Sequence, residues 1–367
     1  MARPQNHQEL PACYAMVHPG LEEVAAEEIR AELGGDVKRA EDGFVVFRLR
    51  EIDRGILQLR TTEDVYLHAW GTDKLSYRAT DLESIRRWTD KDADWPALLK
   101  IHHAVTPKPK GKPTFHLVVQ MTGVHGYRRI DARNALAQGL AGKIPASWRL
   151  VEENAALEFW LSIHGATAIC GLRLSDRTMR QRAYKVEHFP ASLRPTMAAA
   201  MIRLADLKPH HVLLDPMCGA GTILAEAHQY ARQHERPQVP WRLTLLGGDI
   251  DPHHVRAAKA NLHHLPELPL RTWDARRLPL EDTSVDRIVC NLPFGKQLSS
   301  PEEIGPLYYD AIPEMDRVLR PRGKAVLLVA EAQALKAAIH PVGWKQERFL
   351  PVRVLGQRAV IMVYRKP

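Results

Sequence analysis

The C-terminal half of the chain alternates short apolar runs with segments whose apolar residues recur at helical spacing. Strands are predicted at residues 212–214, 243–247, 285–290, 324–330, 344–350 and 358–364, with a further short strand ending at 273–275. Helices are predicted at residues 223–227, 255–262 and 301–319, the last with an irregularity at Pro313. Buried strands that alternate with helices indicate an α/β domain around a largely parallel sheet.

The N-terminal half shows a different order of elements. A strand, a helix, a strand and a further helix are predicted at residues 13–17, 21–33, 43–47 and 49–59. This order is typical of a small ferredoxin-like α+β unit. A helical stretch, a strand, a helix and a strand pair are predicted next, at residues 81–99, 114–120, 131–144, 157–163 and 167–174.

The first strand of the C-terminal half leads into a glycine-rich turn and then a helix. The turn reads Asp215-Pro216-Met217-Cys218-Gly219-Ala220-Gly221-Thr222. Glycines let the backbone approach a ligand, and the helix start offers free amide groups to a carboxylate. A dinucleotide site is the competing interpretation. It is disfavoured because Leu224 stands where its fingerprint requires a small residue, and Asp249 lies farther downstream than its ribose acid should.

Acidic residues follow the next two strands. Asp249 comes directly after 243–247 and Gly248, where a carboxylate can accept hydrogen bonds from both hydroxyls of a ribose. Asp274 follows the short third strand and can accept a hydrogen bond from an adenine amine. Either acid alone is more often a surface or capping residue. Ligands of such sheets bind at the carboxyl ends of the strands. Because the glycine turn, Asp249 and Asp274 each follow a predicted strand, together they predict a nucleoside site.

A fourth strand end carries the sequence Asn291-Leu292-Pro293-Phe294. An amide side chain, a main-chain carbonyl followed by proline and a flat aromatic ring together suit a planar group that bears an amine. The amide oxygen and the carbonyl of Leu292 accept the two amine hydrogens, while Phe294 stacks on the ring. Taken alone, these residues also fit an ordinary turn. The three ligand-binding features upstream favour the interpretation as a clamp.

Positive charge is concentrated in one stretch of the chain. The net charge is +8, yet residues 1–100 carry 14 Lys and Arg against 19 Asp and Glu, whereas residues 101–150 carry 8 against 1. A localised basic surface attracts a polyanion, and nucleic acids are the structured polyanions of the cell. The alternative is a solvated basic face without a partner.

Cysteine usage and hydropathy set the compartment. The four cysteines are Cys13, Cys170, Cys218 and Cys290, without a C-x-x-C pair, which favours a reducing compartment and no metal. A covalent cytosine mechanism requires a cysteine within the loop that follows the fourth strand, where this chain has Asn291 and Phe294. We find no signal peptide and no apolar run long enough for a membrane span, and therefore expect a soluble, cytoplasmic protein.

The order of these motifs resembles that of the class I S-adenosyl-L-methionine-dependent methyltransferases, over residues 191–367. The resemblance implies a Rossmann-like, seven-stranded methyltransferase domain that uses S-adenosyl-L-methionine. It places the acceptor at Asn291, Leu292, Pro293 and Phe294, which are the catalytic residues that it implies. It places the cofactor at Asp215, Pro216, Cys218, Gly219, Gly221, Thr222, Asp249, Ile250, Asp274, Ala275 and Asn291.

The preceding region resembles the ferredoxin-like region and THUMP domain of RNA-modifying enzymes. The segment 177–195, which contains Arg182-Ala-Tyr184-Lys185, and the Leu-Pro-aromatic-Gly form of the acceptor loop resemble THUMP-containing tRNA guanosine-N2 methyltransferases. The expected divisions are 1–65 (ferredoxin-like), 66–174 (THUMP), 175–190 (linker) and 191–367 (methyltransferase). The RNA-binding residues expected are Lys108, Lys110, Lys112, Arg128, Arg129, Arg133, Lys143, Arg182 and Lys185.

The expected reaction is methylation of the N2 amine of a guanosine in tRNA, in the acceptor stem at a position such as 6, with position 10 as a second choice. Ribosomal RNA guanosine-N2 or adenine-N6 methylation and protein glutamine methylation are the alternatives. A protein or small-molecule methyltransferase has no use for the basic N-terminal half, and a pure RNA-binding protein has none for the acids and the clamp. Thiouridine synthesis needs a Ser-Gly-Gly-x-Asp loop, which we do not find. We expect a monomer with tRNA as its partner, without metal or membrane.

Overall fold

The computed structural model describes residues 11–107, 111–187, 189, 192–238, 240–265, 268–294 and 301–367. These residues fold into two compact units. The first comprises the described residues up to Val17 together with Ala26–Ala40 and Phe44–Met179. The second comprises His18–Ala25, Glu41–Gly43 and the described part of Arg180–Pro367.

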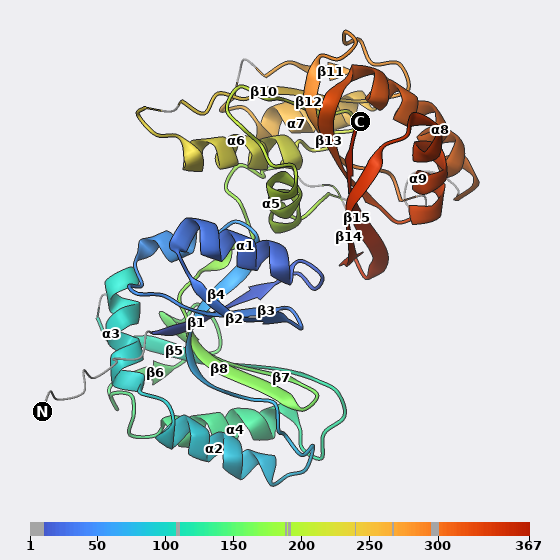
Figure 1. The fold of residues 1–367 in the computed structure, drawn as a ribbon. Coiled ribbons are helices and arrows are strands. Elements are labelled where there is room, and N and C mark those ends of the chain that lie inside the picture. Colours follow the sequence, from blue (N-terminus) through green and yellow to red (C-terminus); the bar gives the residue numbers. More distant parts are fainter. Residues whose placement is uncertain are drawn as a thin grey trace, which may run out of the picture. The chain divides into compact units, whose positions relative to one another are not determined.

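The second unit is built on a seven-stranded sheet (Figure 1). Its strands are β9 (Val212–Asp215), β10 (Thr244–Asp249), β11 (Leu270–Thr272), β12 (Val285–Asn291), β13 (Leu319–Val329), β14 (Lys345–Val354) and β15 (Gln357–Arg365). In space they follow the order β11-β10-β9-β12-β13-β15-β14. Among the described strands of this sheet, β15 runs in the opposite direction to the other six. The carboxyl ends of β9, β10, β11 and β12 therefore share one edge of the sheet, as the sequence predicts.

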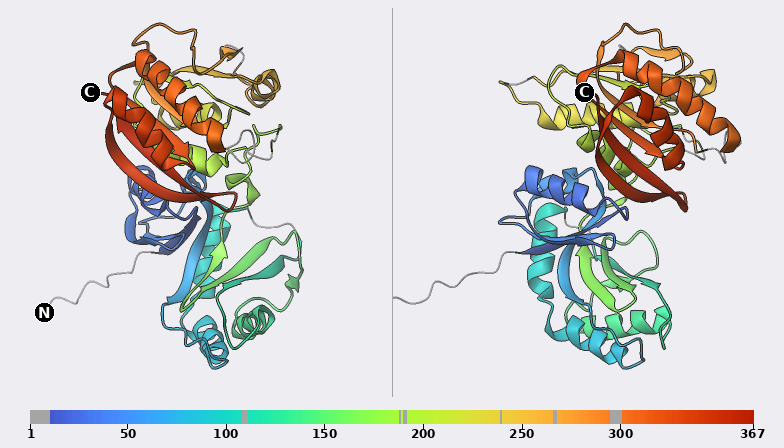
Figure 2. Two further views of the ribbon diagram at one scale, coloured as in Figure 1. Left: turned by 90° about the vertical axis from the view of Figure 1, so that its right-hand side faces the viewer. Right: turned by 45° about the vertical axis from the view of Figure 1, so that its right-hand side comes forward.

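Helices cover both faces of this sheet (Figure 2). They are α5 (Pro195–Leu204), α6 (Thr222–His234), α7 (Pro252–Asn261), α8 (Pro301–Val318) and α9 (Ala332–Ile339). Leu213 and Val289 pack with α5, α6 and α7 in one buried cluster, whereas Leu214 and Ile288 pack with α8 and α9 in another. Neighbouring strand residues thus face opposite layers, which explains why these strands are apolar throughout. The result is the three-layer α/β fold of a Rossmann-like class I methyltransferase domain.

The first unit contains an eight-stranded mixed sheet. Its strands are β1 (Ala12–Val17), β2 (Asp36–Glu41), β3 (Phe44–Arg48), β4 (Thr62–Thr72), β5 (Thr114–Thr122), β6 (Arg149–Leu150), β7 (Leu157–His164) and β8 (Thr167–Arg173), in the spatial order β2-β3-β1-β4-β8-β7-β5-β6. Its helices are α1 (Glu22–Leu33), which begins in the second unit, α2 (Asp81–Lys91), α3 (Trp95–Val105) and α4 (Arg129–Leu140). Strand β4 joins the two halves of this sheet, because it pairs with β1 on one side and β8 on the other.

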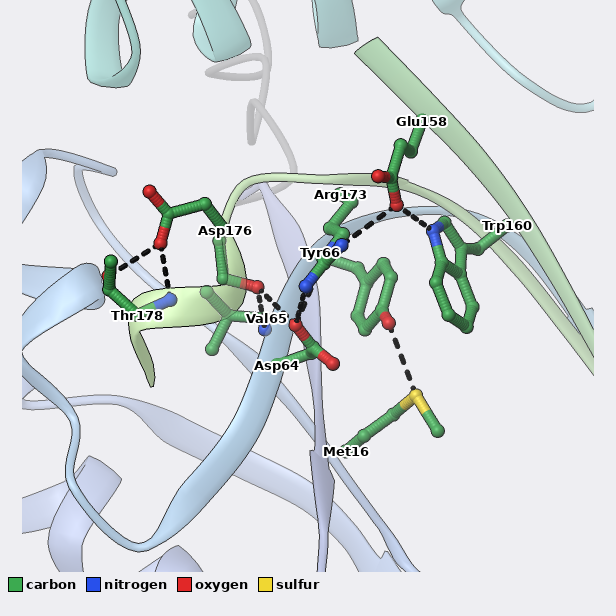
Figure 3. Close-up of polar contacts among 10 residues, drawn as sticks. Met16, Asp64, Val65, Tyr66, Glu158, Trp160, Arg173, Asp176 and Thr178 are labelled. Carbon is green, nitrogen blue, oxygen red and sulfur yellow. Dashed lines mark hydrogen bonds and ion pairs between the residues drawn. The ribbon is translucent and has the colours of Figure 1, made fainter. Parts of the chain in front are cut away.

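A buried ion-pair network fastens that central junction (Figure 3). Arg173 of β8 donates from Nε to Asp64 of β4 at 2.9 Å and from Nη1 to Glu158 of β7 at 2.8 Å. Ser175 also donates to Asp64, at 2.8 Å, and the Trp160 indole donates to Glu158 at 2.7 Å. Removing one partner of a buried pair leaves an uncompensated charge, so loss of Asp64 or Arg173 alone should destabilise this junction.

Two helix predictions in this unit are wrong in their extent. Residues 49–59 form only a short 3-10 turn, Arg54–Gln58, whose start is capped by the side chain of Asp53. The predicted helix at 81–99 is two helices, because Pro96 lacks an N–H and sits in the first turn of α3, where no intrahelical donor is needed. Asp94 caps that turn by accepting from the N–H of Ala97 at 3.1 Å.

Several elements were not predicted. Strands β2, β4 and β6 and helices α5 and α9 have no counterpart among the expected segments, and β4 crosses the predicted domain boundary at 65/66. Helix α8 runs through both Pro306 and Pro313. No described helix has the length and apolarity that a bilayer crossing requires.

Candidate cofactor and acceptor site

The glycine turn after β9 is shaped by two left-handed glycines. Gly219 has φ +50° and Gly221 has φ +77°, and Gly221 is the N-cap of α6. A Cβ atom at Gly221 would lie 2.7 Å from Cδ1 of Leu262, so only glycine fits there. A Cβ atom at Gly219 would meet no atom of the described residues within 4 Å. The turn is therefore packed against α7 at Gly221 and open at Gly219, which leaves its backbone accessible to a ligand.

Asp249, at the end of β10, is fixed by hydrogen bonds within the site. Its Oδ2 accepts from the N–H of Gly219 at 2.9 Å, and its Oδ1 accepts from the N–H of Asp251 at 3.0 Å. The ring Nδ1 of His254 lies 3.1 Å from the same Oδ1. The carboxylate thus links the ends of β9 and β10 and is held in one orientation before any ligand arrives. A carboxylate has about four lone-pair positions and three are used here, so acceptor capacity remains for one ribose hydroxyl.

Asp215 ends β9 and is almost entirely buried. Burial, with the charge of Asp249 as a smaller cause, raises its pKa to about 8. With that pKa, Asp215 is protonated at neutral pH and able to donate a hydrogen bond. Thr222, which begins α6, is also buried.

The predicted adenine residues lie around the end of β11. The carboxylate of Asp274 accepts from the Arg276 side chain at 2.7 Å and from its backbone N–H at 2.9 Å, and the pKa of Asp274 is lowered by that arginine. Ile250 is 64% exposed and Ala275 is buried. The indole of Trp273 donates to the carbonyl of Pro216 at 2.9 Å and so joins β11 to the glycine turn.

The acceptor loop follows β12 and is anchored on both sides. The N–H of Leu292 donates to the carbonyl of Leu328 at 3.0 Å, and the hydroxyl of Tyr308 in α8 donates to the carbonyl of Pro293 at 2.9 Å. Phe294 packs against the cluster formed with α5, α6 and α7. The Oδ1 atom of Asn291 is buried and has no hydrogen-bond partner within the described part of the chain. Buried polar atoms usually have partners, so this oxygen at a strand end is a candidate contact for a ligand.

The cysteines beside the site are inert thiols. Cys218 and Cys290 are buried, and burial raises the pKa of each well above its usual range. A thiol in that state is a poor nucleophile, which disfavours a covalent cytosine mechanism. Across the described ranges, no group of three His, Cys, Asp or Glu side chains has the arrangement of a metal site.

The predicted RNA-binding residues fall into three groups. Lys108 and Lys110 lie outside the described residues. Lys112, Arg128 and Arg129 are exposed in the first unit. The remaining four are Arg133 and Lys143 in the first unit and Arg182 and Lys185 in the second, and all four are at most partly exposed.

Most of these charges have partners. Arg128 pairs with Asp131 at 3.3 Å, Arg133 with Glu152 at 2.7 Å and Lys143 with Asp90 at 3.0 Å. Such pairs near the surface exchange readily for phosphate contacts, because each contributes little.

Arg182 and Lys185 have different surroundings. Arg182 lies 3.4 Å from the buried carboxylate of Glu226, and Lys185 Nζ donates to the carbonyl of Leu193 at 2.7 Å. Burial lowers the pKa of Lys185 to about 8. Both side chains therefore make intramolecular contacts in the second unit.

An aromatic pair, one member of which lies close to Arg128 in the chain, was not predicted from the sequence. Tyr77 has φ +64° and a 44% exposed side chain, and its ring stacks on His125 at a centroid distance of 5.1 Å. The N–H of Gly126 donates to the carbonyl of Tyr77 at 2.7 Å, which fastens the two loops together. A stacked aromatic beside arginines is typical of a surface that binds single-stranded nucleic acid. No local pattern connects two loops so distant in sequence.

The residues described above suit S-adenosyl-L-methionine, the methyl donor of domains with this fold. The backbone at Gly219 is open, Asp249 is oriented, and the unpartnered oxygen of Asn291 lies at the fourth strand end on the same edge. A carboxylate with free acceptor capacity suits the ribose, and the open glycine backbone beside the start of α6 suits the methionine carboxylate.

Comparisons with known proteins agree with this geometry. A tRNA (guanine(6)-N2)-methyltransferase from Thermus thermophilus is 28% identical over 333 residues, which cover 89% of this chain and 91% of that protein. A tRNA (guanine(6)-N(2))-methyltransferase from Mus musculus is 30% identical over 262 residues, 66% of this chain and 50% of that protein. This chain thus spans about half the length of the mammalian relatives it matches.

The fold and the family agree. The crystal structure of TrmN from Thermus thermophilus superposes with a TM-score of 0.76 at 25% identity, covering 97% of this chain and 99% of that chain. The family model described as "RMKL-like, methyltransferase domain" matches residues 182–358, which span the sheet, the glycine turn and the acceptor loop. Residues 182–358 of this chain are therefore similar to the methyltransferase domain of the RMKL-like family.

Proposed function

We propose that this protein transfers a methyl group from S-adenosyl-L-methionine to the exocyclic N2 amine of a guanosine in tRNA. The observation that carries the proposal is the buried, unpartnered Oδ1 of Asn291 at the end of β12. An acceptor that no protein donor satisfies is suited to an amine hydrogen of the substrate. When bound, the cofactor supplies an electrophilic methyl group on a sulfonium that departs as a neutral thioether.

The acceptor loop positions the amine. Asn291 Oδ1 and the carbonyl of Leu292 accept its two hydrogens, and Phe294 stacks on the guanine ring. The hydroxyl of Tyr308 already donates to the carbonyl of Pro293, so the carbonyl of Leu292 is the main-chain acceptor. Two acceptors draw the amine out of conjugation with the ring and stabilise the positive charge that develops on nitrogen. Holding the amine in line for attack contributes about 7 to 11 kcal/mol to the rate enhancement.

The first unit provides an RNA-binding surface in this proposal. Arg128 and Arg129 are exposed, and they closely follow His125 in the chain. The ring of His125 stacks on Tyr77, and the N–H of Gly126 donates to the carbonyl of Tyr77. Arginines bind phosphates while an exposed ring stacks on an unpaired base. We therefore assign Lys112, Arg128, Arg129, Arg133 and Lys143 to RNA, together with Lys108 and Lys110. Arg182 and Lys185 are the weaker assignments, because each is used within the second unit.

The choice of tRNA guanosine rests on the relatives. The Thermus thermophilus protein, named for tRNA guanine(6)-N2 methylation, aligns over most of both chains, including the N-terminal region. This favours a guanosine in the acceptor stem over rRNA guanosine, adenine-N6 or protein glutamine acceptors. In this proposal residues 1–65 form a ferredoxin-like region, 66–174 a THUMP domain, 175–190 a linker and 191–367 the methyltransferase domain. The protein acts as a cytoplasmic monomer.

Nucleoside mass spectrometry tests the proposal. tRNA and rRNA are purified from cells without the gene and from the same cells complemented with wild type or with Asn291→Ala. The expected result is loss of N2-methylguanosine from tRNA digests without the gene, and its return only with wild type. Loss confined to rRNA, or loss of N6-methyladenosine instead, contradicts the proposed substrate. Fragment mapping of the tRNA then identifies the nucleotide.

A further inference from the structure

Asn261, the last residue of α7, joins two segments that are far apart in sequence. Its side chain is fully buried. The Oδ1 atom accepts from the N–H groups of Val186 and Glu187 at 2.9 and 2.8 Å. The Nδ2 group donates to the carbonyl of Glu187 at 3.1 Å and to the carbonyl of Ala220, in the glycine turn, at 2.9 Å. One amide thus uses its full hydrogen-bonding capacity to connect residues 186–187 to the glycine turn.

The same segment is attached to α6, which starts at the glycine turn. The hydroxyl of Tyr184 donates to Glu226 at 2.6 Å, and Arg182 lies 3.4 Å from the same carboxylate. Glu226 is itself almost entirely buried. Residues 182–187, which we call the strap, therefore lie against both helices that flank the turn, α6 and α7.

A third contact lies just beyond the strap. The ring of Phe189 packs on His254, with centroids 4.8 Å apart, and His254 Nδ1 lies 3.1 Å from Oδ1 of Asp249. The proposed ribose-binding carboxylate is therefore also in contact, through one histidine, with the chain that follows the strap.

We propose that the strap is part of the cofactor site and that its order is coupled to cofactor binding through Asn261, acting as a positioning residue. A ligand that fixes the glycine turn also fixes the carbonyl of Ala220, and hence the amide that holds Val186 and Glu187. Coupling of this kind is reciprocal, so loosening the strap weakens cofactor binding by the same factor. The inference rests on the proposed cofactor site. It extends that site to the strap, which contains none of the proposed cofactor-binding residues.

The decisive comparison uses two substitutions of one exposed residue in the full-length protein. Glu187→Pro removes the N–H that donates to Asn261, whereas Glu187→Ala keeps it and removes only the side chain. Calorimetry with S-adenosylhomocysteine should show a dissociation constant about tenfold higher for Glu187→Pro and within about twofold of wild type for Glu187→Ala. Equal affinity of the two variants would overturn the coupling.

Hydrogen exchange in the wild-type protein provides a second readout that needs no variant. The N–H groups of Val186 and Glu187 should exchange about tenfold more slowly with saturating S-adenosylhomocysteine than without it. A merely structural role for Asn261 predicts the same slow exchange in both states, and that result would also overturn the coupling. If wild type binds no S-adenosylhomocysteine, the proposed cofactor site itself is wrong, which is a distinct outcome from two equally tight variants.

Discussion

The cofactor half and the acceptor half of the site are built on opposite principles. At the ends of β9 and β10 the polar groups bind one another, so that Asp249 and the N–H of Gly219 have partners before any ligand is present. At the end of β12, Asn291 keeps a buried oxygen without a partner among the described residues. The first half gains stability from its own hydrogen bonds, and the second gives up stability to keep an acceptor for the substrate.

The largest effect expected is on turnover. Asn291→Ala should lower kcat by about two orders of magnitude or more, because one preorganised acceptor is lost, while cofactor affinity changes by only a few-fold. Single-turnover kinetics with tRNA, alongside calorimetry with the cofactor, separates the two quantities. Near-wild-type turnover would show that Asn291 does not position the acceptor amine. An equal loss of cofactor affinity would show that Asn291 serves both halves of the site.

The opposite signature is expected on the cofactor half. Asp249→Ala removes the carboxylate that orients the glycine turn and is assigned to the ribose, so the dissociation constant of S-adenosyl-L-methionine should rise about 30-fold. RNA affinity should not change. Asp251→Ala is the matched control, because that side chain caps α7 by accepting from the N–H of His253. If calorimetry gives both variants wild-type affinity, Asp249 does not bind the ribose of the cofactor.

Charge reversal in the first unit should affect neither half of the site. Changing Arg128, Arg129 and Arg133 to Glu should weaken tRNA binding about tenfold or more and flatten its salt dependence, because fewer counterions are released. Cofactor affinity should stay at the wild-type value. A salt titration in which affinity and slope both match wild type would show that this patch is an ordinary solvated surface.

The last expected effect is on stability, and it depends on pH. The pKa of Asp215 is raised to about 8 in the folded protein, against 3.8 as its ordinary value. Between these values the folded state holds a proton that the unfolded state has released, so this group makes stability fall as pH rises from about 4 to 8, by at most about 1.4 kcal/mol per pH unit. Asp215→Asn should flatten that decline in denaturant unfolding. An identical pH profile in both proteins would mean that Asp215 is ionised when folded.

Sequence patterns predicted the second unit better than the first, for a physical reason. Strands buried on both faces are continuous apolar runs, and β9, β12 and β13 were recognised in that way. In the first unit, β2 is polar and none of its residues is buried, so it resembles a loop. The stretch at 49–59 has helical spacing of apolar residues, but Gly55 and the Asp53 cap limit it to a single 3-10 turn.

The residues of the candidate site also differ in how well the sequence predicted them. Asp215, Asp249 and Asn291 were predicted because each follows an apolar run, which is a local signal. Asn261 was not, because its partners at 186–187 and 220 are joined to it only by the folded chain. Long-range hydrogen bonds leave no periodic trace in one sequence. The protonated state of Asp215 was equally invisible, since it depends on burial.

The position of β15 also has a consequence for synthesis. This strand lies between β13 and β14, although both neighbours precede it in the chain. During translation the emerging polypeptide therefore exposes two unpaired strand edges until residues 357–365 have left the ribosome. The methyltransferase sheet can close only after translation of its final strand, and a chain that stalls earlier exposes β13 and β14 edges prone to pairing with other chains.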